Sequence, residues 1–108
     1  MSNTIIVHRT GQAPLRVRGE VVASNGTTEG QGSPGRWQDV KVIKTASKRY
    51  VASIHYNTLW QGEHGTDEAV VLPGLSQVVE YLGERVPGWM LTELIKELGE
   101  EAVAEEVD

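Results

Sequence analysis

The chain has 108 residues, no cysteine, 39% hydrophobic residues and a formal net charge of −5. This length indicates a single domain that can bury a real core. The lack of cysteine excludes disulfides, thiolate metal sites and cysteine nucleophiles, and it favours a reducing cytoplasm over secretion. No apolar run approaches the ~18 residues of a membrane span.

The charge is divided by position along the chain. Residues 1–56 hold eight Lys and Arg against three Asp and Glu, a balance of +5. Residues 57–108 hold two Lys and Arg against twelve Asp and Glu, a balance of −10. Such an asymmetry bears on partners and association rather than on the fold.

The first two thirds of the chain have the pattern of β-strands. Apolar and polar residues alternate with a period of two, which is typical of a strand with one wet face. The predicted strands are residues 4–9, 15–21, 36–45, 49–56 and 69–72. The glycine-rich residues 25–35 form a predicted loop, because they carry too little apolar surface to pack.

The last third changes to a helical period. Two stripes recur at i, i+3, i+4 and i+7, separated by Pro87-Gly88, which interrupts a helix. The first stripe is Leu75, Val78, Val79, Leu82 and Val86, and the second is Leu91, Leu94, Ile95, Leu98 and Ala102. Gly99 is the predicted end of the second helix, and residues 100–108 are an acidic tail.

Strands followed by helices predict the α+β class. The simplest assembly is an antiparallel five-stranded meander with a C-terminal two-helix hairpin packed on one face. Residues 1–99 would then form one domain, and the other face of the sheet would stay open. We expect recognition of a partner through that open face.

Basic and aromatic residues gather in the predicted strands and in the turn at residues 46–48. Such residues on a sheet are able to hold an anionic partner, through contacts to its charges and stacking on its bases. The predicted set is Arg16, Arg18, Lys41, Lys44, Lys48, Arg49, Trp37 and Tyr50. The partner is either an acidic protein segment or single-stranded nucleic acid.

Three apolar residues interrupt the polar side of the predicted sheet. Val22, Ile43 and Val51 fall on the side opposite the inferred core. A semi-apolar open sheet is a natural surface for a second copy. The sequence therefore predicts a homodimer or a partner surface there.

Two other interpretations remain open. Glutamates of the predicted helices, such as Glu93 and Glu97, could occupy a basic groove of another protein, as an acidic inhibitor does. Alternatively, Glu63, His64 and Asp67 could form a small enzyme site in a loop. No histidine spacing typical of a metal site and no nucleophile motif is present, so we predict no metal, no cofactor and no enzymatic activity.

Three segments together resemble a family of small prokaryotic proteins, the EXLDI proteins. They are VRGEVVA at residues 17–23, VIKTASKRYV at 42–51 and LSQVVEYL at 75–82, and the chain ends in EEVD at 105–108. The resemblance implies the same α+β fold and an uncharacterised function. Taken with the residues above, it favours a binding or regulatory module.

Overall fold

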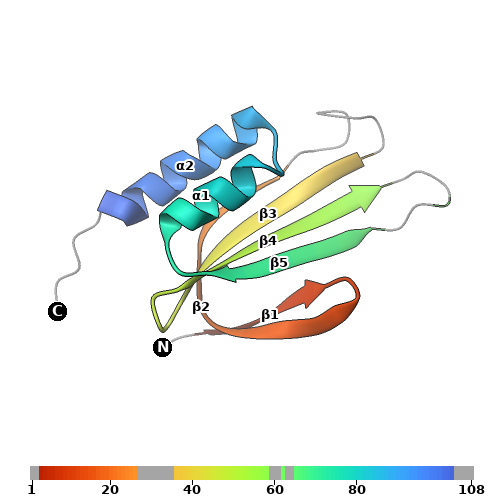
Figure 1. The fold of residues 1–108 in the computed structure, drawn as a ribbon, viewed down its shortest axis with the longest axis horizontal. Coiled ribbons are helices and arrows are strands. Elements are labelled where there is room, and N and C mark those ends of the chain that lie inside the picture. Colours follow the sequence, from red (N-terminus) through yellow and green to blue (C-terminus); the bar gives the residue numbers. More distant parts are fainter. Residues whose placement is uncertain (1–2, 27–35, 59–61, 63–64, 104–108) are drawn as a thin grey trace.

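A computed structural model describes residues 3–26, 36–58, 62 and 65–103. These residues form one antiparallel sheet, with its strands in sequence order, followed by two helices (Figure 1). The strands are β1 (Asn3–Arg9), β2 (Gln12–Gly26), β3 (Arg36–Thr45), β4 (Tyr50–Thr58) and β5 (Thr66–Leu72). The helices are α1 (Leu75–Gly83) and α2 (Gly88–Val103). The predicted α+β meander with a C-terminal helix pair is confirmed.

The main core lies between the helices and one face of the sheet. Both helices cover the same face, α2 against β2 and α1 against β4 and β5 (Figure 1). The buried side chains of this layer are Val78, Leu82, Met90, Leu94 and Leu98 of the helices and Val86 of their connection, and they meet Ala23, Val40, Val42, Tyr50, Ala52 and Ile54 of the sheet. Each large apolar side chain buried here contributes about 1.5–3 kcal/mol, which makes this contact the main source of stability.

A second core lies on the opposite face of the same strands. Ile43 of β3 and Val51 of β4 are buried there against Val7 of β1 and Val17 of β2. The β1–β2 hairpin reaches this face because β2 is 15 residues long and carries a register shift between Val21 and Ala23. A bulge of this kind bends a strand and increases its twist.

The curled sheet brings its two edge strands together at one point. Thr10, in the turn after β1, donates its backbone N–H to the carbonyl of Asp67, with an N–O distance of 2.9 Å. The backbone N–H of Asp67 donates to the Thr10 hydroxyl at 2.7 Å. The expectation of a wholly open second face is therefore wrong, because the bent hairpin covers part of it.

Several predicted element boundaries differ from the structure. α1 ends at Gly83, before Val86, and α2 continues through Gly99 to Val103. Gly99 lies within α2, so it does not form the C-terminal cap that the sequence predicts. Neither helix, within the described residues, has the length and apolar character needed to cross a membrane.

A polar cluster ties the connection between the helices to the sheet. Glu68 of β5 accepts a hydrogen bond from the Tyr56 hydroxyl at 3.2 Å and pairs with Arg85 Nε at 3.2 Å. The Arg85 guanidinium also lies 3.9 Å from the centre of the Tyr81 ring. Burial and the nearby Glu68 carboxylate raise the pKa of Tyr56 and of Tyr81, so this cluster favours neutral phenols.

The second core gives a first prediction. Ile43→Ala should lower the free energy of unfolding by about 2–5 kcal/mol, because it opens a cavity where Ile43 is 1% exposed. Val21 is the matched control, since it pairs with Ile43 in the register but is 45% exposed. Val21→Ala should cost less than about 1 kcal/mol. Urea unfolding measures both, and equal losses would contradict a covered second face.

The tyrosine cluster gives a prediction about alkaline pH. A phenol whose pKa is raised by folding stabilises the protein fully below the ordinary pKa of 10.0, and this stabilisation is lost as pH rises beyond it. Urea unfolding of the protein should therefore show a decline in stability that begins near that pH. Tyr81→Phe should flatten the decline, because the phenyl ring keeps its place beside Arg85 without an ionisable group. An unchanged slope in this variant would exclude Tyr81 as a source.

Candidate functional site

Three arginines gather beside the turn between β3 and β4. Arg16 and Arg18 alternate with the inward-facing Leu15 and Val17 on β2, so their exposed side chains share one side of the strand. A surface hollow of about 390 Å³ is lined by Leu15, Arg16, Val17, Arg18, Thr45, Ala46, Ser47 and Arg49. No carboxylate belongs to this lining. We call Arg16, Arg18 and Arg49, with Thr45 and Ser47, the arginine surface.

Hydrogen bonds within the turn hold Arg49 in place. The Thr45 hydroxyl accepts the Arg49 backbone N–H at 2.9 Å, and Arg49 Nε donates to the Ser47 hydroxyl at 3.3 Å. Lys48 has φ of +66°, a left-handed conformation that closes the turn tightly. The guanidinium and two hydroxyls are thereby presented together at the end of the β3–β4 hairpin.

Gly19 allows β2 to approach this turn closely. A Cβ atom at position 19 would fall on the carbonyl oxygen of Lys44, a backbone atom that cannot move aside cheaply. Next to it, the carbonyl of Arg18 accepts the Ala46 backbone N–H at 2.8 Å. The absence of a side chain at Gly19 therefore allows β2 to lie against the backbone at the end of β3.

The other predicted members of the basic set lie elsewhere. Lys41 belongs to the sheet face opposite the helices, and Lys44 is opposite Glu20 and Tyr50, on the helix-covered side. The two lysines separate because they are three positions apart on a strand, where side chains alternate between faces. Lys48 occupies the turn but does not line the arginine hollow.

The two aromatic members do not supply a stacking surface. Tyr50 is 8% exposed and belongs to the main core, so its ring is not available to a base, which corrects that prediction. The side chain of Trp37 lies outside the described residues. Of the predicted basic and aromatic residues, Arg16, Arg18 and Arg49 line the arginine hollow.

The predicted dimer surface is also corrected. Ile43 and Val51 are each 1% exposed in the second core, and Val22 packs against the main core. These side chains are covered because the β1–β2 hairpin folds over them and the bulge turns Val22 inward. They do not offer an apolar patch to a second copy. Homodimerisation itself stays a prediction, but Val22, Ile43 and Val51 do not supply its surface.

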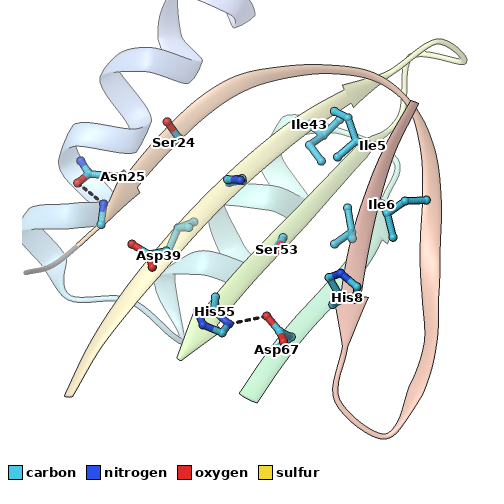
Figure 2. Close-up of a pocket in the computed structure, with 14 residues that line it drawn as sticks. Ile5, Ile6, His8, Ser24, Asn25, Asp39, Ile43, Ser53, His55 and Asp67 are labelled. Atoms are coloured by element: carbon cyan, nitrogen blue, oxygen red, sulfur yellow. Dashed lines mark hydrogen bonds and ion pairs between the residues drawn. The ribbon is translucent and has the colours of Figure 1, made fainter. Parts of the chain in front are cut away.

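A larger hollow opens on the sheet face away from the helices. Its volume is about 560 Å³, and Figure 2 shows Ile5 and Ile43 at one end and the His55–Asp67 pair at the other. The lining residues that carry polar side chains are His8, Ser24, Asn25, Asp39, Lys41, Ser53, His55 and Asp67. We call this cavity the sheet hollow. It forms where the bent β2 strand and β1 rise from β3 and β4.

His55 and Asp67 form the shortest polar contact in the sheet hollow. Nδ1 of His55 lies 2.6 Å from Oδ1 of Asp67, and the two residues face each other directly across β4 and β5. The histidine side chain is 43% exposed. Asp67 was predicted to act with Glu63 and His64, which lie outside the described residues. The sequence does not predict the pairing of Asp67 with His55, because no local pattern reveals the register between β4 and β5.

The described residues contain no group of three His, Cys, Asp or Glu side chains placed to hold a metal ion. No protein-family model, curated protein or solved structure matches this chain. The resemblance to EXLDI proteins therefore stays a prediction.

The close approach at Gly19 gives a testable prediction. Gly19→Ala should push β2 away from the β3–β4 turn and lower the free energy of unfolding by about 2 kcal/mol or more, as steric overlap in a packed site does. Gly99→Ala is the matched control, because a Cβ there meets nothing within 4 Å and alanine favours the helix. Thermal unfolding compares the two. A neutral Gly19→Ala would show that the strands have room to separate.

Proposed function

We propose that this chain is a non-enzymatic binding module that recognises an acidic segment of a partner protein through the arginine surface. The observation that carries the proposal is that Arg16 and Arg18 of β2 and Arg49 of the β3–β4 turn line one hollow, in whose described lining no carboxylate occurs. A planar guanidinium pairs with a carboxylate through two parallel hydrogen bonds. Three of them therefore suit a run of glutamate or aspartate side chains.

The compactness of the arginine surface favours a protein segment over single-stranded nucleic acid. A strand of nucleic acid needs an extended basic groove with aromatic side chains for its bases. Here neither Lys41 nor Lys44 lines the hollow, and Tyr50 is buried. A short acidic peptide requires neither the length nor the rings.

The energy of such contacts defines what the surface is able to do. An exposed ion pair contributes about 0.2–1 kcal/mol, so the three arginines alone hold a partner weakly. Complementary charge contributes more to the rate of encounter and to orientation than to affinity. The half-buried Leu15, which also lines the hollow, supplies a part of the contact that does not depend on salt.

The proposal predicts which basic side chains contribute to binding of an acidic peptide. The double variant Arg16→Ala with Arg18→Ala should weaken binding of a fluorescein-labelled glutamate-rich peptide by roughly tenfold, about 1.4 kcal/mol for two contacts. Fluorescence anisotropy at low salt measures this affinity, which should decline as salt is added.

Lys41→Ala together with Lys96→Ala is the matched control, because it removes the same charge from exposed positions away from the arginine surface. This control should bind the peptide nearly as well as the unmodified protein does. Equal weakening in both double variants would reduce the effect to net charge and contradict the proposal. Tighter binding of a single-stranded oligonucleotide than of the peptide would contradict the choice of partner.

A further inference from the structure

The sheet hollow is ordered into tiers by the strand register. On this face, every second residue of β3 pairs with every second residue of β4. From the end under β1 outward, the pairs are Ile43 with Val51, Lys41 with Ser53, and Asp39 with His55. The hollow therefore changes from an apolar tier, through a tier of hydrogen-bond donors, to a tier that includes a carboxylate.

The outermost tier is extended by β5. His55 faces Asp67 in the register and lies 2.6 Å from it, so two carboxylates flank the imidazole in one row across three strands. Asp39 is exposed and accepts a hydrogen bond from the Asn57 side chain at 3.0 Å. This row is thus a place for a cationic or hydrogen-bond-donating group of a ligand.

The charges of the sheet hollow select against simple ions. Lys41 disfavours a ligand that carries only a positive charge, because its ammonium stands one tier from the carboxylates. Asp39 and Asp67 likewise disfavour a fatty-acid-like anion. A zwitterion satisfies both tiers, provided that its two charges are separated in the same direction as those of the hollow.

We propose that the sheet hollow binds a zwitterionic ligand of the amino-acid class with an apolar side chain. The side chain would lie against Ile5 and Ile43, the carboxylate would meet Lys41 and Ser53, and the ammonium would meet the Asp39–His55–Asp67 row. Alternate residues on a strand are about 7 Å apart. That spacing fits an α-amino acid, whose adjacent charges each reach a protein group through a hydrogen bond of about 2.8 Å.

The volume of the sheet hollow limits the size of this ligand. About 560 Å³ lies within the range of small-molecule sites, roughly 300–1,000 Å³. It accommodates a single amino acid with a large apolar side chain. A ligand with so few atoms is expected to bind with a dissociation constant that is roughly millimolar.

L-Phenylalanine is the probe for the test, followed by NMR titration of the ¹⁵N-labelled full chain. We expect chemical-shift changes that saturate and that centre on the amides of Ile43, Ser53 and His55. Two analogues each lack one charged group: 3-phenylpropanoate has no ammonium, and phenethylamine has no carboxylate. Each should bind at least roughly fivefold more weakly, because it leaves one tier without its partner.

Lys41→Met keeps the aliphatic stem of the lysine and removes its charge. It should weaken L-phenylalanine binding by roughly tenfold and leave phenethylamine binding unchanged or stronger. Lys96→Met is the matched control, since it removes the same charge from the exposed side of α2. The amide spectrum of each variant reports directly that the fold is retained, and Lys41→Gln is the second variant if Lys41→Met is not folded.

Three results would overturn the proposal. The first is the absence of shift changes at the sheet hollow up to the solubility limit of L-phenylalanine. The second is binding of 3-phenylpropanoate or phenethylamine as strong as that of L-phenylalanine, which would exclude recognition of a zwitterion. The third is an equal loss in Lys41→Met and Lys96→Met. None of these results bears on the arginine surface, whose residues lie outside the hollow.

Discussion

The burial of β3 and β4 on both faces is the constraint on which the rest of this structure depends. The helices cover one face, and the β1–β2 hairpin covers the end of the other face that holds Ile43 and Val51. Central strands covered on both sides are a common solution in larger sheets. In a chain of 108 residues, the second cover has to come from the same sheet, so one strand must be long and bent. The bulge at Val21 and Ala23 bends β2 so that it serves both purposes.

Both candidate surfaces follow from that bend. Where β2 crosses the end of the β3–β4 hairpin, its outward side chains Arg16 and Arg18 come beside Arg49. Between β1 and the last residues of β2, 24–26, the face of β3 and β4 stays uncovered and forms the sheet hollow. A straight β2 would extend the sheet as a flat layer, in which neither the arginine surface nor the sheet hollow would exist.

Local pattern was sufficient to predict the elements and the helix-covered core. The helical stripes place Val78, Leu82 and Leu94 inward, and the structure buries all three. Ile95 of the second stripe is nevertheless exposed, and Met90, which belongs to neither stripe, is fully buried. The second core could not be predicted in the same way, because an apolar residue on the far side of a strand has two meanings: it is either an exposed patch or a position covered by another element. The sequence favours an exposed patch at Ile43 and Val51, whereas in the structure the β1–β2 hairpin covers both side chains. The neighbouring valines at positions 21 and 22 break the alternation, and this was the available signal of a bulge.

The candidate sites show the same limit. The spacing of Arg16 and Arg18 places them on one side of a strand from sequence alone. Their meeting with Arg49 depends on the path of β2, and the pairing of His55 with Asp67 depends on the register between β4 and β5. The sequence therefore predicts which side chains share one side of a strand, but it does not predict which side chains meet between strands.

The charge division along the chain acquires a spatial meaning in the fold. The acidic residues of the helix layer, such as Glu80, Glu93 and Glu97, are exposed on the elements that cover one face of the sheet, whereas Arg16 and Arg18 are exposed on the hairpin that crosses the other. A molecule with this arrangement carries an electric dipole, which orients a charged partner before contact. An acidic segment is repelled from the helix layer and attracted toward the arginine surface. The net negative charge therefore does not argue against an acidic partner, since the local field at the arginines, and not the sum over the chain, acts on a segment that arrives there.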